Sequence, residues 1–114
     1  MMGTVKIGET AVPMLCTAST NIYYKRIFGV DPLALQTGKE LPIADGINFA
    51  QQLAFIMAQQ AAKNSDRAEL VKLSEDDYID WLDQFDAVDL QMSLEDVMRI
   101  YRKDLDATAK PKKG

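Results

Sequence analysis

Acidic and aromatic side chains crowd into one short stretch of this 114-residue chain, DYIDWLDQFD, from Asp77 to Asp86. It holds the chain's single tryptophan, Trp81, between Asp80 and Asp83. Carboxylates gathered in this way could bind a calcium ion, or could act as a general acid and base if their environments separated their pKa values. They could also form the polar side of a helix that packs in the core or docks on a partner.

The spacing of these acids does not match either kind of chemistry. An EF-hand loop needs a glycine after its first acids and a glutamate at the twelfth position, and this stretch has neither. The chain has no histidine and one cysteine, Cys16, which removes the common nucleophile pairs and zinc sites. We also find no phosphate-binding loop, nucleophile elbow or dinucleotide motif. We therefore predict a protein that is not an enzyme and has no catalytic residues, metal site or cofactor.

A helix explains the stretch more simply. Four apolar side chains recur at the i, i+3, i+4, i+7 spacing of one helix face, Tyr78, Trp81, Leu82 and Phe85. Asp76, Asp80 and Asp83 fall on the other side. Ser74 and Asp77 approximate a capping box that opens this helix. The pattern predicts a surface helix with its aromatic residues in the core and its acids in water.

The N-terminal segment predicts a β-hairpin. Val5 and Ile7 alternate, the chain turns at Gly8-Glu9-Thr10, and a β-favouring run continues from Val12 to Cys16. Pro13 lies in this second run, where its missing N–H requires an edge strand. We expect Cys16 to pack as a small apolar side chain.

Helices are predicted for the rest of the chain. The first begins at Ser19 or Thr20, ends at Gly29 and places Ile22, Tyr23, Ile27 and Phe28 near one face; a short helical turn follows from Asp31 to Gly38. A longer one runs from Asp45 to about Lys63, with Gln51, Gln52, Gln59 and Gln60 on its polar side. It is apolar enough to be either central or covered by a neighbouring chain. A last helix opens at Ser93 with Asp96 and carries Leu94, Val97, Met98, Tyr101 and Leu105.

Together these elements predict an α+β fold, mainly α, with an N-terminal β-hairpin followed by about four helices. We expect one domain over residues 1–106 and a disordered, lysine-rich tail over residues 107–114. The net charge is -4, and nine acids lie between Glu75 and Asp96 without a lysine or arginine. This distribution lacks a basic nucleic-acid footprint. With no signal peptide or membrane-length apolar run, we predict a soluble protein that is not exported on its own and binds neither nucleic acid nor membrane.

Three stretches together resemble the tail assembly chaperones of long-tailed bacteriophages and prophages of Gram-positive bacteria. They are VKIGETAVPMLCTASTNIYYKRIFGVDPL, LAFIMAQQA, and DDYIDWLDQFD with the apolar helix and lysine-rich end that follow it. The similarity extends from Val5 to about Leu105. The sequence departs from the family pattern at Asn21, where similar proteins often have proline.

The resemblance implies a non-enzymatic protein of the host cytoplasm that works while virions assemble. Such a protein binds the long tape measure protein, keeps it soluble and helps recruit tail tube subunits. The resemblance also implies self-association into a homo-oligomer. Proteins of this family often have a longer form made by ribosomal frameshifting.

The residues expected to contact partners form two groups. The first matches the family's aromatic-basic helix, Tyr23, Tyr24 and Arg26, and the second lies on the acidic helix, Asp80, Trp81, Asp83 and Phe85. Ordinary core packing remains the alternative for the aromatic members. An acidic decoy that occupies a basic nucleic-acid-binding surface is the alternative function.

The final lysines generate a prediction that the gene itself can test. Pro111-Lys112-Lys113 can be encoded as CCA AAA AAR, which contains the slippery run A AAA AAR. Codon pairing survives a one-base slip there, because every displaced codon still reads A. We expect this run in the gene and a minor longer product that shares residues 1 to about 113. A codon choice that breaks the run, or the lack of an open frame beyond it, would exclude frameshifting at this position.

Overall fold

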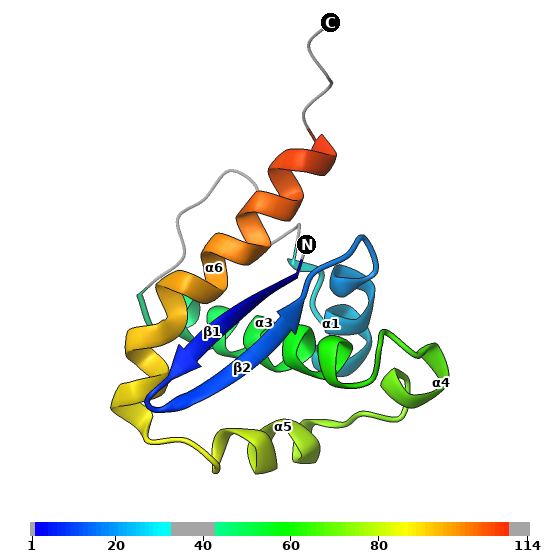
Figure 1. Cartoon of the computed structure of the whole chain (residues 1–114). Coiled ribbons are helices and arrows are strands. Elements are labelled where there is room, and N and C mark those ends of the chain that lie inside the picture. The colour runs from blue at the N-terminus through cyan, green and yellow to red at the C-terminus, as the bar shows by residue number, and fades with distance from the viewer. Residues whose placement is uncertain (1, 33–42, 110–114) are drawn as a thin grey trace, which may run out of the picture.

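The predicted hairpin and helices are present in the computed structural model, which describes residues 2–32 and 43–109 (Figure 1). The elements are β1 (Met2–Ile7), β2 (Thr10–Leu15), α1 (Thr20–Phe28), α3 (Ile43–Ala62), α4 (Arg67–Leu70), α5 (Glu75–Leu82) and α6 (Ala87–Ala109). The α+β, mainly α fold class is therefore confirmed. The helical turn predicted from Asp31 to Gly38 lies mostly outside the described residues.

The two strands form an antiparallel hairpin in which Ile7 pairs with Thr10 across a two-residue turn. Gly8 occupies the first turn position with a φ of 63°, a conformation that glycine adopts without strain. A Cβ atom at Gly8 would also lie only 2.6 Å from a carboxylate oxygen of Asp89. Pro13 faces Thr4 in a pair that exchanges no hydrogen bonds, because such pairs alternate with the bonded pair at the turn. The ladder therefore loses nothing to this proline.

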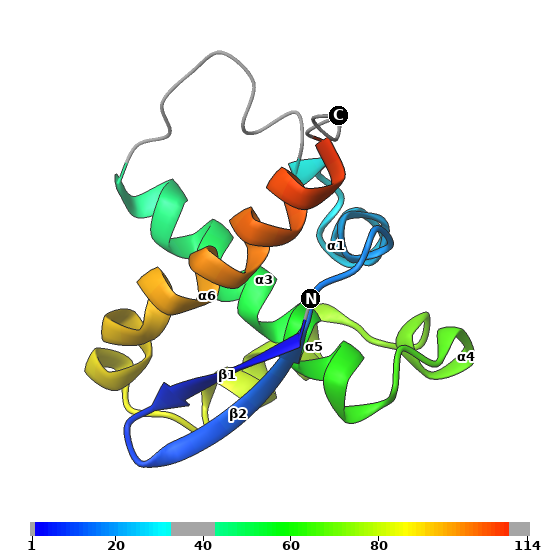
Figure 2. The ribbon, with the colours of Figure 1, turned by 45° about the horizontal axis from the view of Figure 1, so that its top comes forward.

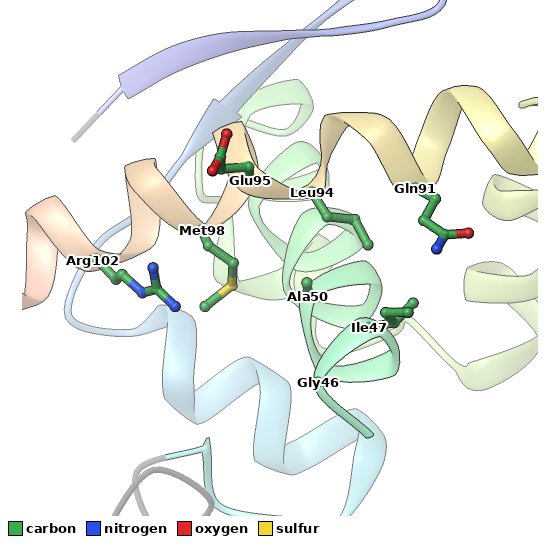
Figure 3. A pocket seen from close by; sticks show the side chains of 8 residues that line it. All are labelled: Gly46, Ile47, Ala50, Gln91, Leu94, Glu95, Met98 and Arg102. Atoms are coloured by element: carbon green, nitrogen blue, oxygen red, sulfur yellow. The ribbon is translucent and has the colours of Figure 1, made fainter. Parts of the chain in front are cut away.

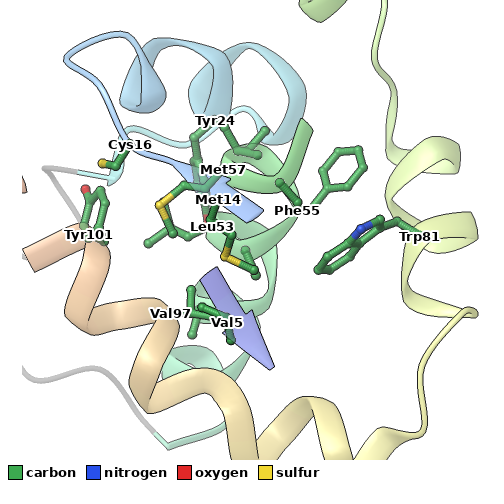
Figure 4. Packing of buried hydrophobic residues seen from close by; sticks show 14 of the residues in the cluster. Val5, Met14, Cys16, Tyr24, Leu53, Phe55, Met57, Trp81, Val97 and Tyr101 are labelled. Carbon is green, nitrogen blue, oxygen red and sulfur yellow. The ribbon is translucent and has the colours of Figure 1, made fainter. Parts of the chain in front are cut away.

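Helix α3 runs through the middle of the molecule. It packs against β2, α6, α1 and α5, while β1 lies beside α6 (Figures 1 and 2). Six consecutive residues of α3 are buried, from Leu53 to Ala58, so no side of this part of the helix faces solvent. Their neighbours in the core include Val5, Met14 and Tyr101 (Figure 4). Of the two environments left open by the sequence, the central one is correct.

Gln60 departs from the predicted polar side of α3, because its side chain is fully buried. Its amide oxygen accepts a hydrogen bond from the Thr20 hydroxyl at 2.6 Å, and its amide nitrogen donates to the Thr17 hydroxyl at 3.1 Å and to the Ser65 hydroxyl at 3.2 Å. This amide therefore joins α3 to the β2–α1 connection and to the turn that follows α3. The buried cysteine, Cys16, lies at the start of that connection, as predicted.

Two details of the helices were predicted wrongly. Ile22 is exposed, because α1 turns Tyr23 and Tyr24 into the core instead. The last helix begins at Ala87, where the Asp86 carboxylate accepts a hydrogen bond from the N–H of Val88 at 2.9 Å. Ser93 is consequently a buried residue within that helix.

The sequence reasoning also missed one helix and misplaced one boundary. No helix was predicted between Lys63 and Ser74, but this segment contains α4, which Asp66 caps by accepting a hydrogen bond from the N–H of Ala68. Helix α6 extends to Ala109, into the predicted tail, because no strong helix breaker occurs before Pro111. Residues 110–114 lie outside the described part of the chain.

The Gln60 contacts predict a specific loss of stability. Replacing Gln60 with leucine keeps a similar volume but leaves the buried hydroxyl of Thr20 without its acceptor. Such an orphaned polar group costs roughly 1–3 kcal/mol, so we expect Gln60→Leu to lower the free energy of unfolding by about 2 kcal/mol. Urea denaturation followed by circular dichroism measures this change.

Gln51→Leu is the matched control on the same helix. The Gln51 side chain is half-buried and makes no hydrogen bond with the described residues. We expect a change within about 0.5 kcal/mol for this variant. Equal stability of the two leucine variants would show that the Gln60 contacts contribute nothing.

Candidate protein-binding surface

Helix α5 carries the acidic stretch, and its start is held by the predicted capping box. The Ser74 hydroxyl accepts a hydrogen bond from the N–H of Asp77 at 3.4 Å, and the Asp77 carboxylate accepts one from the N–H of Ser74 at 2.9 Å. Acids in the first turn also interact favourably with the positive end of the helix dipole. The cap thus fixes where the helix begins and which residues it turns inward.

Aromatic contacts attach α5 to the rest of the fold. The Tyr78 ring lies 5.1 Å from Phe28 of α1 and 5.5 Å from Phe55 of α3, centroid to centroid. Trp81 lies 5.9 Å from Phe55 and 5.0 Å from Phe85. Edge-on and tilted ring pairs at these separations are favourable. The inner face of α5 is therefore a packing surface, as the sequence predicted.

The structure separates the proposed partner-binding residues into buried and exposed groups. Tyr23, Tyr24 and Trp81 are buried, at 7%, 2% and 7% exposure, and Phe85 is half-buried. Arg26, Asp80 and Asp83 are exposed. The buried aromatic residues belong to the hydrophobic core, so their main contacts are those of ordinary core packing. The charged residues are the members that are accessible at the surface.

Asn21, where the sequence departs from the family pattern, has a structural role. Its side-chain oxygen accepts a hydrogen bond from the Tyr101 hydroxyl at 2.7 Å. This bond connects α1 to α6 across 80 positions of the chain. A proline here would have no side-chain acceptor for Tyr101.

Exposed apolar side chains accompany the acids, and sequence reasoning passed over them. Ile79 on α5 is 53% exposed, and Val88 and Met92 on α6 are 62% and 78% exposed. Ile79 lies on the face of α5 that faces away from Trp81, between the acids. An isoleucine on the face of the helix predicted to be polar was the signal in the sequence that could have identified this residue. Val88 and Met92 were missed because the start of α6 was misplaced.

One small cavity reaches the indole of Trp81. It has a volume of about 200 Å³ and lies between β2, the second half of α3, and α5. Its walls are formed by Val12, Pro13, Ala58, Gln59, Ala61, Ala62 and Trp81. The predicted residue Trp81 is therefore both a core residue and part of a cavity wall.

A wider and more open groove lies along the surface where α3 and α6 meet (Figure 3). Its volume is about 410 Å³. The apolar side chains are Ile47, Ala50, Leu94 and Met98, while Gln91, Glu95 and Arg102 supply polar groups of both charges. Figure 3 shows Met98 and Arg102 extending from α6 into the space beside α3.

Two tyrosine hydroxyls have raised pKa values. Burial, with smaller contributions from Tyr78 and Tyr101, raises the pKa of Tyr24 to about 12, and burial raises the pKa of Tyr78 to about 12. The Tyr24 hydroxyl donates a hydrogen bond to the side-chain oxygen of Gln52. The buried Tyr78 hydroxyl has no hydrogen-bond partner among the described residues.

The candidate surface consists of exposed carboxylates and apolar side chains and contains no cluster of metal-binding side chains among the described residues. Within residues 2–32 and 43–109, no three histidine, cysteine, aspartate or glutamate side chains are grouped to hold a metal ion. None of the helices in these ranges is long and apolar enough to cross a membrane. Exposed carboxylates attract cationic side chains, and exposed apolar residues add contact area once a partner has docked.

Comparisons with known proteins add no relative. No protein-family model, curated protein or solved structure matches the chain. The similarity to tail assembly chaperones therefore stays a prediction from the sequence.

The unpartnered hydroxyl of Tyr78 predicts a stabilising substitution. Tyr78→Phe keeps the ring contacts and removes a buried donor that bonds to nothing among the described residues. We expect the free energy of unfolding at neutral pH to rise by about 1 kcal/mol.

The raised pKa of Tyr78 also predicts that the stability of the parent chain falls at alkaline pH. A group whose pKa rises on folding from 10.0 to about 12 stabilises the fold below pH 10 and loses this effect as the pH rises toward 12. Stability should therefore fall less steeply over this range in Tyr78→Phe.

Tyr24→Phe is the matched control, because it removes a hydroxyl that does have a partner. We expect this variant to lose about 1 kcal/mol at neutral pH. Urea titrations at pH 7 and at several values between pH 10 and 12 compare both variants with the parent chain. If Tyr78→Phe is destabilised as much as Tyr24→Phe, the hydroxyl of Tyr78 has a partner in solution.

Proposed function

We propose that this chain is a tail assembly chaperone of a long-tailed bacteriophage or prophage. It binds the tape measure protein in the host cytoplasm, keeps it soluble and helps bring tail tube subunits to it. It acts as a homo-oligomer and carries out no catalysis. The observation that carries the proposal is the set of exposed apolar side chains among the acids of α5 and the first half of α6. Glu95 and Asp96 pair with Arg99, but the acids of α5 form no ion pair with any described residue.

The physical needs of such a chaperone agree with this surface. A long helical protein with apolar faces aggregates unless those faces are covered, and covering them requires apolar contacts. Ile79, Val88 and Met92 supply contacts of this kind. The surrounding carboxylates keep the chaperone itself soluble and steer basic segments toward it. The chain has no lysine or arginine between Glu75 and Met98, and among the acids of this segment only Glu95 and Asp96 form an ion pair with a described residue, Arg99.

The exposed apolar residues also argue against the alternative function, an acidic decoy that imitates nucleic acid. A decoy that imitates nucleic acid presents charge, since the phosphate backbone dominates the affinity that it must copy. Ile79 instead places an exposed apolar side chain beside Asp76 and Asp83, which lie three residues before it and four residues after it. This arrangement favours a protein surface as the partner.

Co-expression tests the proposal directly. A neighbouring gene for a very long helical protein identifies the partner, and we expect that protein to stay soluble only when this chain is produced with it. Asp80→Lys combined with Asp83→Lys should reduce the soluble fraction, because the reversed charges repel basic segments. The melting temperature should stay close to that of the parent chain, since exposed charges usually change stability by about 0.5 kcal/mol or less.

Glu9→Lys combined with Glu69→Lys is the control, because both acids are exposed and the net charge changes equally. This control should keep the partner soluble. Equal solubility of the partner with and without the chain would remove the proposed function.

A further inference from the structure

We infer that the cavity beside Trp81 receives one apolar side chain of the tape measure protein, from a segment that carries lysine or arginine next to that side chain. This inference rests on the proposed function, which supplies the partner. It adds the docking point and the chemistry of the docking segment.

The size of the cavity suits a single side chain. Its volume of about 200 Å³ is smaller than the roughly 300–1,000 Å³ of pockets that hold small-molecule ligands. It is also several times the share of about 30 Å³ that one water molecule occupies in the liquid. A large aliphatic or aromatic side chain fills such a space, and anchors of this kind dominate the energy of many interfaces.

The lining explains why the space is open and what it recognises. Ala58, Ala61 and Ala62 are too short to fill the gap that α3 leaves toward β2 and α5. Pro13 and Trp81 provide rigid apolar surface on other sides. The indole N–H of Trp81 forms no hydrogen bond with any described residue, so it can donate one to the arriving segment.

The charge around the cavity selects the flanks of the docking segment. With about 100° between successive helical residues, Asp77 and Asp80 lie on one flank of Trp81, and Tyr78 lies on the other. Tyr78 packs on Phe28 and Phe55, so its flank belongs to the core. Asp80 is exposed and makes no ion pair with any described residue. A cation beside the apolar anchor would pair with it.

The larger groove between α3 and α6 lacks this selectivity. Glu95 and Arg102 present opposite charges there, and Glu95 already pairs with Arg99 at 3.9 Å. The walls of the Trp81 cavity contain no charged residue, and α5 places Asp77 and Asp80 on one flank of Trp81. The observations therefore point to the Trp81 cavity as the docking point.

Filling the cavity from within tests the inference. Ala61→Leu places a side chain in the space without introducing charge, and Asp80→Asn removes the neighbouring charge. Overlapping peptides that tile the long tail protein encoded beside this gene serve as probes. We expect at least tenfold weaker binding of the best peptide to Ala61→Leu, and severalfold weaker binding to Asp80→Asn with a reduced dependence on salt. Ala68→Leu, at an exposed position of α4, is the matched control and should bind as the parent chain does.

Fluorescence of Trp81 supplies a second measurement that needs no variant, because it is the chain's single tryptophan. Binding of the best peptide should shift its emission to shorter wavelength as the anchor displaces water. Replacing the peptide's apolar anchor with alanine should abolish the shift. Melting temperatures show whether Ala61→Leu still folds, and Asp80→Asn provides the test if it does not.

The outcomes separate the two proposals. In one outcome the long tail protein stays soluble with the chain, but the best peptide binds Ala61→Leu and Asp80→Asn as it binds the parent chain and leaves the Trp81 emission unchanged. The docking point is then wrong, and the chaperone function stands. If no peptide binds and co-expression has no effect, both proposals fall.

Discussion

The buried side chain of Gln60 joins parts of the fold that no regular ladder connects. Its amide bonds to Thr17 and Thr20 at the β2–α1 connection and to Ser65 in the turn after α3. Ser65 has a φ of 54°, an uncommon conformation for a residue other than glycine. The buried part of α3 is otherwise apolar on all sides, and non-directional apolar contacts oppose sliding or rotation less specifically than hydrogen bonds do. A buried polar group that must be satisfied opposes such movement.

Holding α3 in place also determines the geometry of the proposed binding site. Phe55 orients Tyr78 and Trp81, while the alanines one and two turns further along leave the space that Trp81 borders. Gln60 belongs to the same half of α3 and fixes the rotation of that half. The residues that stabilise the fold and those that shape the cavity are therefore neighbours on one helix.

How much the sequence predicted depends on the range of the interactions. The hairpin, the capping box and the inward face of α5 follow from local periodicity, and all are present. The start of α6 was wrong because Ser93 and Asp96 imitate a cap locally, whereas the Asp86 carboxylate is the group that accepts from the first turn. Gln60 was placed on a polar side because its partners are up to 43 positions away. Likewise, the acids of the candidate surface were evident, but the cavity exists only where β2, α3 and α5 converge.

The burial of Trp81 strengthens its case as an anchor. A fully exposed tryptophan samples several rotamers and loses that freedom when a partner binds, which costs affinity. Contacts with Phe55 and Phe85 hold the Trp81 ring in place before any partner arrives, while one part of it still borders the cavity. Docking then orders only the arriving segment. Under the proposed function the chain must later release its partner. A cavity for one side chain with the exposed carboxylate of Asp80 beside it suits such reversible binding, because salt weakens the charge interaction.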